Sequence, residues 1–421
     1  MRSGNWEPRG GFTAGAVGTD TGMKNTDAAP GLSSRLADAL AIDHALTEIE
    51  QELDVLLNIT PVNAAEAWVD FERGGFATAP ALQSRPLEFE PDLIKRRLYA
   101  LEIERVDDPA LKNLFLEKRD EIMRQITLLE DRDTSRFIYE SLQLFGDVGE
   151  ALVADANELL GTIPTTTPKD RFVTASAFAE AAQRELDTYR ERYPGFAAEL
   201  EVRPDLSDLM VSHGRFLIPA TAVFRSKRVE ALIQHEVGTH VVTYENGRSQ
   251  PLKLLAVGLP GYDETQEGLA LLAEFVCGGL DPLRLRLLAA RVIAVDRVIN
   301  GADFLEIFEE LREEHHFAPK TAWGVTIRVA RSGGLTKDVI YLRGISRVLE
   351  FVSERKTIEP LLVGKLSLDN VPLVEELIER EILKPPQIRP RWTEGAKAEK
   401  RLARAYNGMR VGDLIDERAV A

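Results

Sequence analysis

The feature that most constrains the fold is a pair of histidines five residues apart, at the two ends of residues 235–240 (HEVGTH). Apolar residues recur at helical spacing through residues 227–244, so the pair belongs to a helix that stops at Asn246 and Gly247. On a regular α-helix, side chains five apart diverge by roughly 140°. A one-residue π-bulge brings the second imidazole back to the first, and Gly238 tolerates the backbone that this requires. The spacing therefore predicts a bulged helix.

Two imidazoles beside a carboxylate form a zinc site when a third ligand comes from elsewhere in the chain. Glu267, in the first turn of the next predicted helix, supplies that ligand. Glu274 lies seven positions on and on the same face, so either carboxylate fits. Gly268 permits the close helix approach that a compact site needs, which favours Glu267 and leaves Glu274 a supporting role. We expect Zn²⁺, with His235, His240 and Glu267 as ligands; the alternative is a surface helix with two solvated histidines.

The glutamate between the histidines suggests the chemistry of the site. Zinc in hydrolases leaves one coordination position to water. Glu236 directly follows a ligand and is expected beside that position, where its carboxylate takes a proton from water and returns it to a leaving amine. Glu236 is therefore the predicted general base.

Most of the remaining chain carries helical patterns. Residues 1–32 lack hydrophobic periodicity and are predicted to be a disordered tail. An N-terminal helical region is expected over 33–165, with helices at 33–57, 91–105, 109–131 and 136–160. A further helix is expected at 175–193. A metallopeptidase domain is expected over 166–390, with a β-hairpin at 209–219 and helices at 227–244, 265–277, 281–300, 303–315, 337–353 and 371–383. Residues 391–421 are expected to form a C-terminal tail. The predicted fold class is α+β and mainly α-helical.

The charge and the apolar runs exclude several classes of protein. Asp and Glu number 68 against 52 Lys and Arg, and the net charge of -16 opposes nucleic acid and anionic lipid. No apolar run reaches the roughly 18 to 20 residues of a membrane span. The N-terminus lacks the apolar core of a secretory signal. We expect a cytoplasmic protein without nucleic-acid or membrane partners, and the oligomeric state stays open.

Residues 235–240 and 266–270 (QEGLA) together carry a resemblance. They are similar to the flavohaemoglobin expression-modulating QEGLA motif proteins, a family that includes the microtubule-associated tyrosine carboxypeptidases. The resemblance covers roughly residues 40 to 385. It implies a zincin-like (gluzincin) fold and matches His235 and His240 to the zinc-binding histidines, Glu236 to the catalytic glutamate and Glu267 to the third ligand.

Residues 328–338 and 341–344 also resemble this family. A carboxypeptidase needs a cation for the free carboxylate of its substrate and a hydrogen-bond donor for the developing oxyanion. Arg328, Arg331 and Lys337 are candidates for the first role, and Tyr341 for the second. The alternative is that these residues are solvated charges or packing partners.

The sequence thus predicts a zinc metallocarboxypeptidase that removes a C-terminal residue, with an aromatic one suggested by the resemblance, from a peptide or protein. Tubulin is expected not to be the substrate, because a partner of the acidic tubulin tail would carry excess positive charge. Two alternatives remain: a zinc hydrolase of a small amide, and a non-catalytic regulatory protein that retains the fold. The intact Glu236 argues against the second, since a structural zinc needs no free base beside it.

Overall fold

The computed structural model describes residues 30–165, 170–204, 206 and 208–415. The chain is mainly helical and carries two small sheets, as expected for the α+β class. The predicted disordered tail lies outside the described residues up to position 29, and its last residues begin the first helix. Among the described residues, no helix is both long and apolar enough to cross a membrane.

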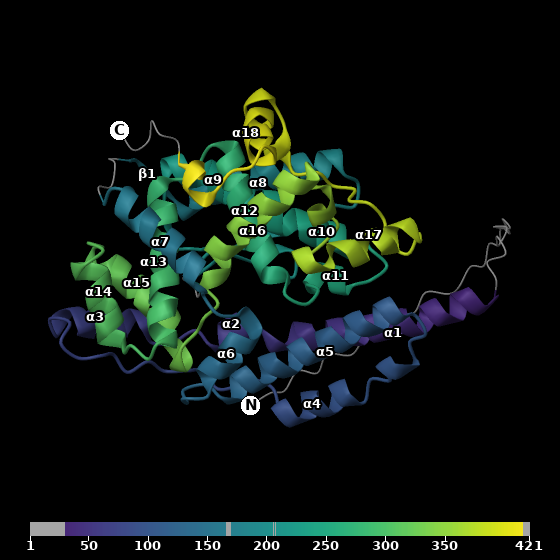
Figure 1. Ribbon diagram of the computed structural model, residues 1–421, viewed down its shortest axis with the longest axis horizontal. Helices are drawn as coiled ribbons and strands as arrows, with labels where there is room; N and C mark the ends of the chain where they lie inside the picture. Colours follow the sequence, from purple (N-terminus) through teal and green to yellow (C-terminus); the bar gives the residue numbers. More distant parts are fainter. Residues whose placement is uncertain (1–29, 166–169, 205, 207, 416–421) are drawn as a thin grey trace, which may run out of the picture.

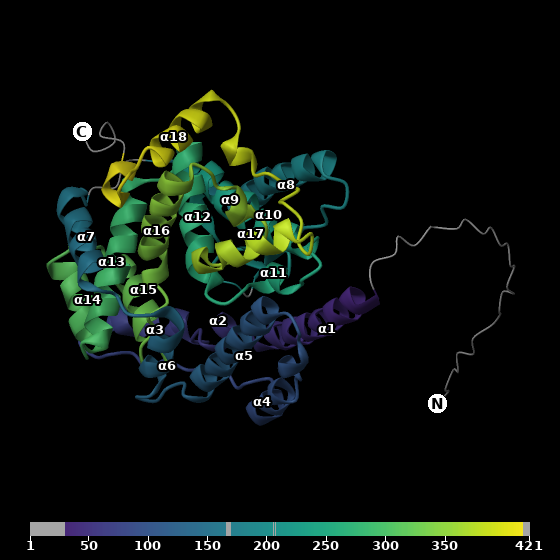
Figure 2. The ribbon, with the colours of Figure 1, turned by 45° about the vertical axis from the view of Figure 1, so that its right-hand side comes forward.

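The N-terminal part consists of seven α-helices, of which α1, α4 and α5 form a layer along one side of the molecule (Figures 1 and 2). Three predicted helices are interrupted: Asp54 adopts a φ of 34° between α1 and α2, the stretch 91–105 forms α4 and the separate η1, and the stretch 136–160 is split by Gly146 and Gly149, at φ 77° and 74°. Helix α3 was not predicted. The bounds are α1 (Pro30–Leu53), α2 (Val55–Asn58), α3 (Ala64–Arg73), α4 (Pro91–Tyr99), η1 (Ile103–Arg105), α5 (Pro109–Glu130), α6 (Phe137–Phe145) and α7 (Glu150–Thr162).

The strands lie between the N-terminal helices and the histidine helix. The hairpin predicted over 209–219 is confirmed as β3 (Met210–Ser212) paired antiparallel with β4 (Arg215–Pro219). A strand that was not predicted, β2 (Glu199–Arg203), pairs parallel with β4, so β3 is an edge strand. A second sheet joins β1 (Phe172–Thr174) to β5 (Val223–Arg225), and α8 (Ala175–Arg192) matches its prediction.

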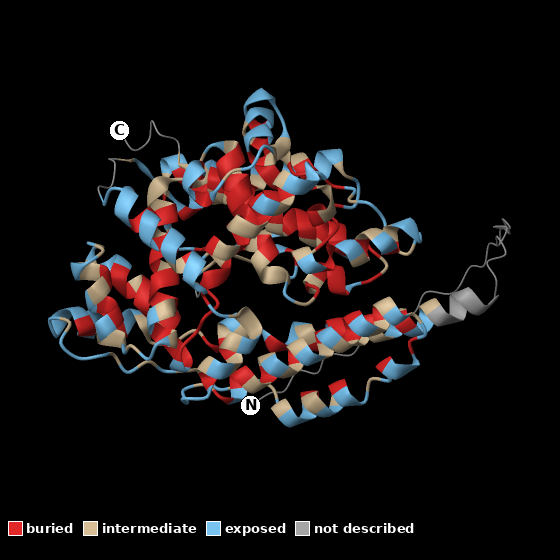
Figure 3. Ribbon diagram, in the orientation of Figure 1, coloured by how far each residue is buried: buried red, intermediate tan, exposed pale blue. Residues whose placement is uncertain are grey.

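The later helices form a bundle in which most of the buried residues gather (Figure 3). Five of the helices predicted here, α12, α13, α14, α16 and α17, appear within a few residues of their expected bounds, whereas α15 was not predicted. The elements are η2 (Ser226–Arg228), α9 (Val229–His235), η3 (Glu236–Val241), α10 (Val242–Arg248), α11 (Leu254–Val257), α12 (Tyr262–Cys277), α13 (Pro282–Ile299), α14 (Phe304–Glu313), α15 (Pro319–Ala330), η4 (Arg331–Gly333), α16 (Val339–Arg355), η5 (Glu359–Leu362), η6 (Leu368–Asn370) and α17 (Val371–Glu379).

Helices α12 and α16 pack with their backbones almost touching. A Cβ atom on Gly268 would lie 2.3 Å from the carbonyl oxygen of Gly344, and one on Gly344 would lie 2.2 Å from that of Glu264. Only glycine fits at such a crossing. The expected role of Gly268 is therefore corrected: it brings α12 close to α16 rather than to the histidine helix.

The expected C-terminal tail is ordered structure as far as Ile415. It contains η7 (Arg391–Thr393), α18 (Ala396–Tyr406) and η8 (Val411–Leu414). Buried side chains on these elements, including Trp392 and Leu402, belong to the same hydrophobic core as the N-terminal helices. One hydrophobic core contains residues from both ends of the chain, so it marks no boundary between the predicted domains. The domain boundaries therefore stay a prediction.

Candidate metal centre

The histidine helix contains the predicted bulge. Residues Glu236–Val241 form a π-helical segment between α9 and α10, so this prediction is confirmed. A π-bulge frees backbone carbonyls, and two of them find side-chain donors: Thr239 Oγ1 donates to Gln234 O at 3.0 Å, and Trp392 Nε1 donates to Gly238 O at 3.1 Å. A Cβ on Gly238 would lie 2.4 Å from Gln234 Oε1 and 2.9 Å from the ring of Trp392, so a larger residue would have to displace these side chains.

This helix ends at Arg248, one residue beyond the predicted stop at Asn246 and Gly247, so both residues lie in the last turn of α10. Asn246 is buried and donates to the carbonyls of Leu362 and Ile388, both at 2.8 Å. A Cβ on Gly247 would lie 2.1 Å from Leu255 O. Contacts with other parts of the chain thus explain why an asparagine and a glycine, which locally resemble a helix terminator, occur within the last turn of this helix.

The three predicted ligands converge from two helices. One ligand atom from each of His235, His240 and Glu267 lies within 4.8 Å of the others. His235 Nε2 is 3.5 Å and His240 Nε2 is 4.0 Å from Glu267 Oε2. Ligands of a tetrahedral zinc ion lie roughly 3.3 Å apart. The donor set and its spacing therefore fit a zinc ion after a small contraction.

The other ring nitrogens of the two histidines face hydrogen-bonding partners. His235 Nδ1 lies 2.9 Å from Glu274 Oε1, and Arg228 donates to the second oxygen of Glu274 at 2.6 Å. His240 Nδ1 lies 3.5 Å from Gln266 Oε1, which also accepts from Thr243 at 2.7 Å. Such partners orient imidazoles and leave Nε2 for a metal. Glu274 thus contacts a candidate ligand instead of joining the three.

The charges of the cluster are strongly coupled. Burial raises the pKa of Glu267, but hydrogen bonding to His235 and the nearby His240 charge outweigh it and lower that pKa to about 2. Burial opposes the charged form of His235, yet Glu267 and Glu274 raise its pKa to about 10. Burial lowers the pKa of His240 to about 4. At neutral pH, Glu267 is ionised and His240 is neutral, as metal ligation requires, whereas His235 is protonated and must release its proton when a metal binds.

Glu236 differs from the other carboxylates of the site. It is only 8% exposed, and among the described residues its carboxylate makes no ion pair or hydrogen bond. Burial raises its pKa to about 7; His235 and Arg284 oppose this rise, and Glu267 and Glu274 add to it. A carboxylate with a pKa near neutrality can both accept and return a proton.

Tyr341 lies on α16, the helix that packs against α12. Burial raises the pKa of its phenol, and the negative charge of Glu267 raises it further. Its hydroxyl has no hydrogen-bond partner within the part of the chain that the structure describes. The guanidinium groups of Arg284 and Arg291 lie 5.8 and 5.3 Å from the centre of its ring. Tyr341 is thus a protonated donor near the predicted ligands.

The three predicted carboxylate-binding cations all have partners in the protein. Arg328 donates to both oxygens of Asp338, at 2.7 and 2.8 Å, and Arg331 donates to Thr60 at 3.2 Å. Lys337 pairs with Asp263 at 2.7 Å. Of the three, only Lys337 borders the large groove between the N-terminal layer and the bundle.

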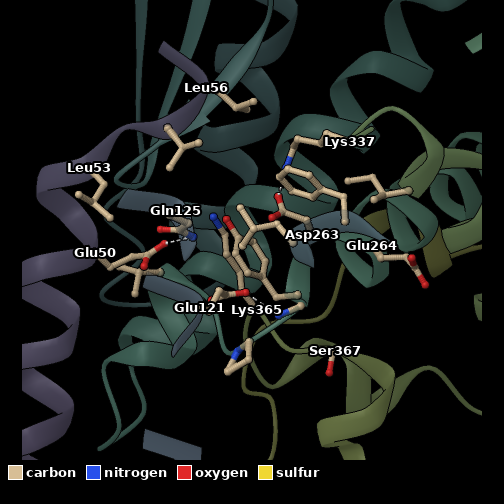
Figure 4. A pocket seen from close by; sticks show the side chains of 18 of the residues that line it. Glu50, Leu53, Leu56, Glu121, Gln125, Asp263, Glu264, Lys337, Lys365 and Ser367 are labelled. Atoms are coloured by element: carbon tan, nitrogen blue, oxygen red, sulfur yellow. Dashed lines mark hydrogen bonds and ion pairs between the residues drawn. The ribbon is translucent and has the colours of Figure 1, made fainter. Parts of the chain in front are cut away.

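A groove of about 660 Å³ runs between the N-terminal layer and the bundle (Figure 4). The edge strand β3 and Tyr244 line one part of it, and Asp263 and Lys337 line another. Asp263 lies one turn before Glu267 on the same face of α12. The groove therefore reaches α12 one turn before Glu267, and the three ligands themselves do not line it.

Sequence reasoning missed several charged residues around the cluster, among them Arg228, Arg284 and Lys365. Arg228 precedes the histidine helix, Arg284 lies in an ordinary amphipathic helix, and Lys365 lies in a loop. None of these positions carries a motif. Arg225 and Asp281, in the same region, form an ion pair. The local sequence therefore does not distinguish charges that are paired within the fold from charges that have no partner.

Comparisons with known proteins agree with the motifs. Residues 69–410 match the microtubule-associated tyrosine carboxypeptidase family. The putative tyrosine carboxypeptidase MATCAP2 of Mus musculus is 28% identical over 179 residues, which are 38% of this chain and 33% of that protein. The microtubule-associated tyrosine carboxypeptidase 1 of Homo sapiens is 31% identical over 157 residues, 34% of this chain and 32% of that protein.

Each aligned segment thus spans about a third of the length of the relative. No solved structure matches the chain. The family match covers most of the sequence, including both motifs and the residues from Arg328 to Tyr341. The chain therefore belongs to the microtubule-associated tyrosine carboxypeptidase family.

Proposed function

We propose that the protein is a zinc-dependent carboxypeptidase with a zincin-like centre. The observation that carries the proposal is the convergence of His235, His240 and Glu267 beside a buried Glu236 that has no partner among the described residues. The two histidines and Glu267 would hold the ion, and Glu274 would orient His235. When bound, zinc supplies a Lewis acid that acidifies water and polarises the scissile carbonyl.

The chain's own groups then move the protons. Glu236 accepts a proton from the attacking water and delivers it to the leaving amine. Tyr341 donates a hydrogen bond to the carbonyl oxygen as negative charge develops there. An extended peptide binds in the groove along the edge strand β3, whose backbone groups on the open side pair with it.

We propose peptide or protein C-termini as substrates, and an aromatic terminal residue in keeping with the names of the two relatives. The expectation against tubulin rested on the net charge alone, and the family name points the other way. Tubulin tails therefore belong in the substrate test. The zinc hydrolase of a small amide and the regulatory protein are outcomes that this test separates.

The test is to measure zinc in the purified protein and to incubate it with a peptide library of diverse C-termini, read by mass spectrometry. We expect loss of single C-terminal residues, and Glu236→Gln should reduce the rate by about 10²- to 10⁴-fold while zinc stays bound. Asp70→Asn, at an exposed ion pair that lines neither the groove nor the cavity at the start of α13, is the matched control and should retain the rate. Cleavage at internal bonds would indicate an endopeptidase. Intact peptides with stoichiometric zinc would refute the proposed activity.

A further inference from the structure

Arg284 stands apart from the other arginines that surround its cavity. This cavity, of about 410 Å³, lies at the start of α13 and is bordered by four arginines. Arg225 pairs with Asp281, Arg228 pairs with Glu274, and Arg286 donates to backbone carbonyls. Arg284 makes no ion pair and no side-chain hydrogen bond among the described residues. Its Nε is buried without a partner.

A buried guanidinium donor without an acceptor is costly, and a bound ligand is one way in which such a donor is satisfied. The ring of Tyr341 lies 5.8 Å from the guanidinium of Arg284. The rest of the cavity wall is mixed: Leu283, Leu287 and Phe317 lie on its apolar part, and Asp281 and His316 lie on its polar part. A pocket with an apolar part and one cation that has no ion pair suits a ligand that combines a hydrophobic side chain with a carboxylate.

The cavity and the groove lie toward opposite ends of α12. Asp263 lines the groove, and Glu267 lies one turn later on the same face. Glu274 lies on that face two turns beyond Glu267, and its partner Arg228 borders the cavity. From Asp263 to Glu274 the helix rises by roughly 16 Å. The predicted ligands are thus between the groove and the cavity.

The position of the proton donor decides on which side of the predicted metal site the last residue of the substrate lies. The amine that Glu236 protonates belongs to that residue, and its carboxylate carbon is roughly 2.5 Å from the amine nitrogen. The cation that binds the carboxylate must therefore lie near Glu236. Arg284 meets this condition through Tyr341, the proposed donor to the carbonyl oxygen of the same bond, because the Arg284 guanidinium lies 5.8 Å from the centre of the Tyr341 ring.

We propose that the cavity beside Arg284 receives the C-terminal residue of the substrate and that Arg284 binds its carboxylate. This inference rests on the proposed function and names its specificity site. Arg328, Arg331 and Lys337 then serve the fold through their own partners. The apolar part of the wall, with Phe317, favours an aromatic or large aliphatic terminal residue.

The experiment measures binding without turnover. The probe is a dye-labelled Gly-Ser peptide ending in tyrosine, as the free acid and as the C-terminal amide, titrated into the zinc-supplemented Glu236→Gln chain by fluorescence anisotropy. We expect the free acid to bind about 10- to 100-fold more tightly than the amide, as for a charge-assisted hydrogen bond. Arg284→Met in this background should abolish the ratio, and Arg284→Lys should restore part of it.

Lys365→Met is the matched control. Lys365 is a cation of the groove that also has no ion pair among the described residues; it lies 5.8 and 5.6 Å from the ring centres of Tyr244 and Tyr262. That variant should keep the ratio between acid and amide, and thermal melting shows whether each variant folds. Equal binding of acid and amide, or loss of the ratio in Lys365→Met with its retention in Arg284→Met, would overturn the inference.

Failure of the inference and of the proposed function are distinguishable. A wild-type chain that removes C-terminal residues while Arg284→Met binds like its parent contradicts only the role of Arg284. A wild-type chain that cleaves no peptide contradicts the proposed function. In that case, tighter binding of the free acid than of the amide, if lost in Arg284→Met, would still support a carboxylate-binding site at Arg284.

Discussion

Two buried charge clusters lie close together in the bundle and differ in how completely their groups are paired. Around Asp338, Arg328 binds both carboxylate oxygens and Arg291 lies 3.6 Å from one of them. Around the histidines, Glu236 and the hydroxyl of Tyr341 have no partner among the described residues. Paired buried charges hold a fold together, whereas unpaired ones at a converging site suggest chemistry. The sequence had suggested functional residues in both clusters.

The sharpest way to break this comparison is to remove the carboxylate of the paired cluster. Asp338→Asn leaves Arg328 and Arg291 without their counter-charge in a buried site. We expect a loss of roughly 3–5 kcal/mol in the free energy of unfolding, measured by urea denaturation.

The matched control is Asp369→Asn, since Asp369 is 78% exposed in its pair with Arg347. An exposed pair of this kind contributes only about 0–1 kcal/mol. Equal effects of the two substitutions would show that the Asp338 cluster does not stabilise the fold.

Within the histidine cluster, the comparison predicts an effect on metal binding. Glu274→Gln keeps an acceptor for His235 but removes the charge that fixes the imidazole. We expect zinc affinity, measured by competition with a chelating dye, to fall about 10- to 100-fold. Glu264→Gln, on the same helix but paired with Arg343 and Arg347, should leave it unchanged. An unchanged affinity in Glu274→Gln would contradict the proposed orientation of His235.

The smallest expected effect concerns Lys365, an unpaired cation on the groove side. Burial lowers its pKa to about 8, with Asp263 and Glu267 opposing. The folded state then binds fewer protons than the unfolded state between pH 8 and 10.5, so the stability of the wild-type chain gains from this residue as pH rises through that window.

Lys365→Met removes this contribution. Because Lys365 is only half-buried, the variant should be more stable than wild type by about 1 kcal/mol at pH 6, and the difference should shrink above pH 8. Thermal melting across this range measures it. A difference independent of pH would show that charge burial at Lys365 is not its cause.

The local geometry of the site could be predicted from the sequence because it depends on the spacing of two histidines within one helix. Two histidines five apart required a bulge, and a π-helical segment is found between them. The long helices were predicted where apolar periodicity was strong, as for α5 and α8.

The errors came from long-range contacts. Asn246 and Gly247 resemble a helix end, but the bonds of Asn246 to Leu362 and Ile388 hold them inside α10. Arg328 and Lys337 were predicted to bind the substrate carboxylate, but each forms an ion pair within the protein, Arg328 with Asp338 and Lys337 with Asp263. Arg284 carried no local signal, since the absence of a partner is visible only when the surroundings are known.

The central claim is that His235, His240 and Glu267 bind one divalent ion with a position left for water. X-ray absorption at the zinc K-edge of the zinc-loaded chain tests it most directly. We predict two imidazole nitrogens at roughly 2.0–2.1 Å, oxygen ligands at similar distance and no sulfur. The imidazole signal should halve in His240→Ala. A spectrum with no imidazole ligands, or one unchanged in His240→Ala, would contradict the account.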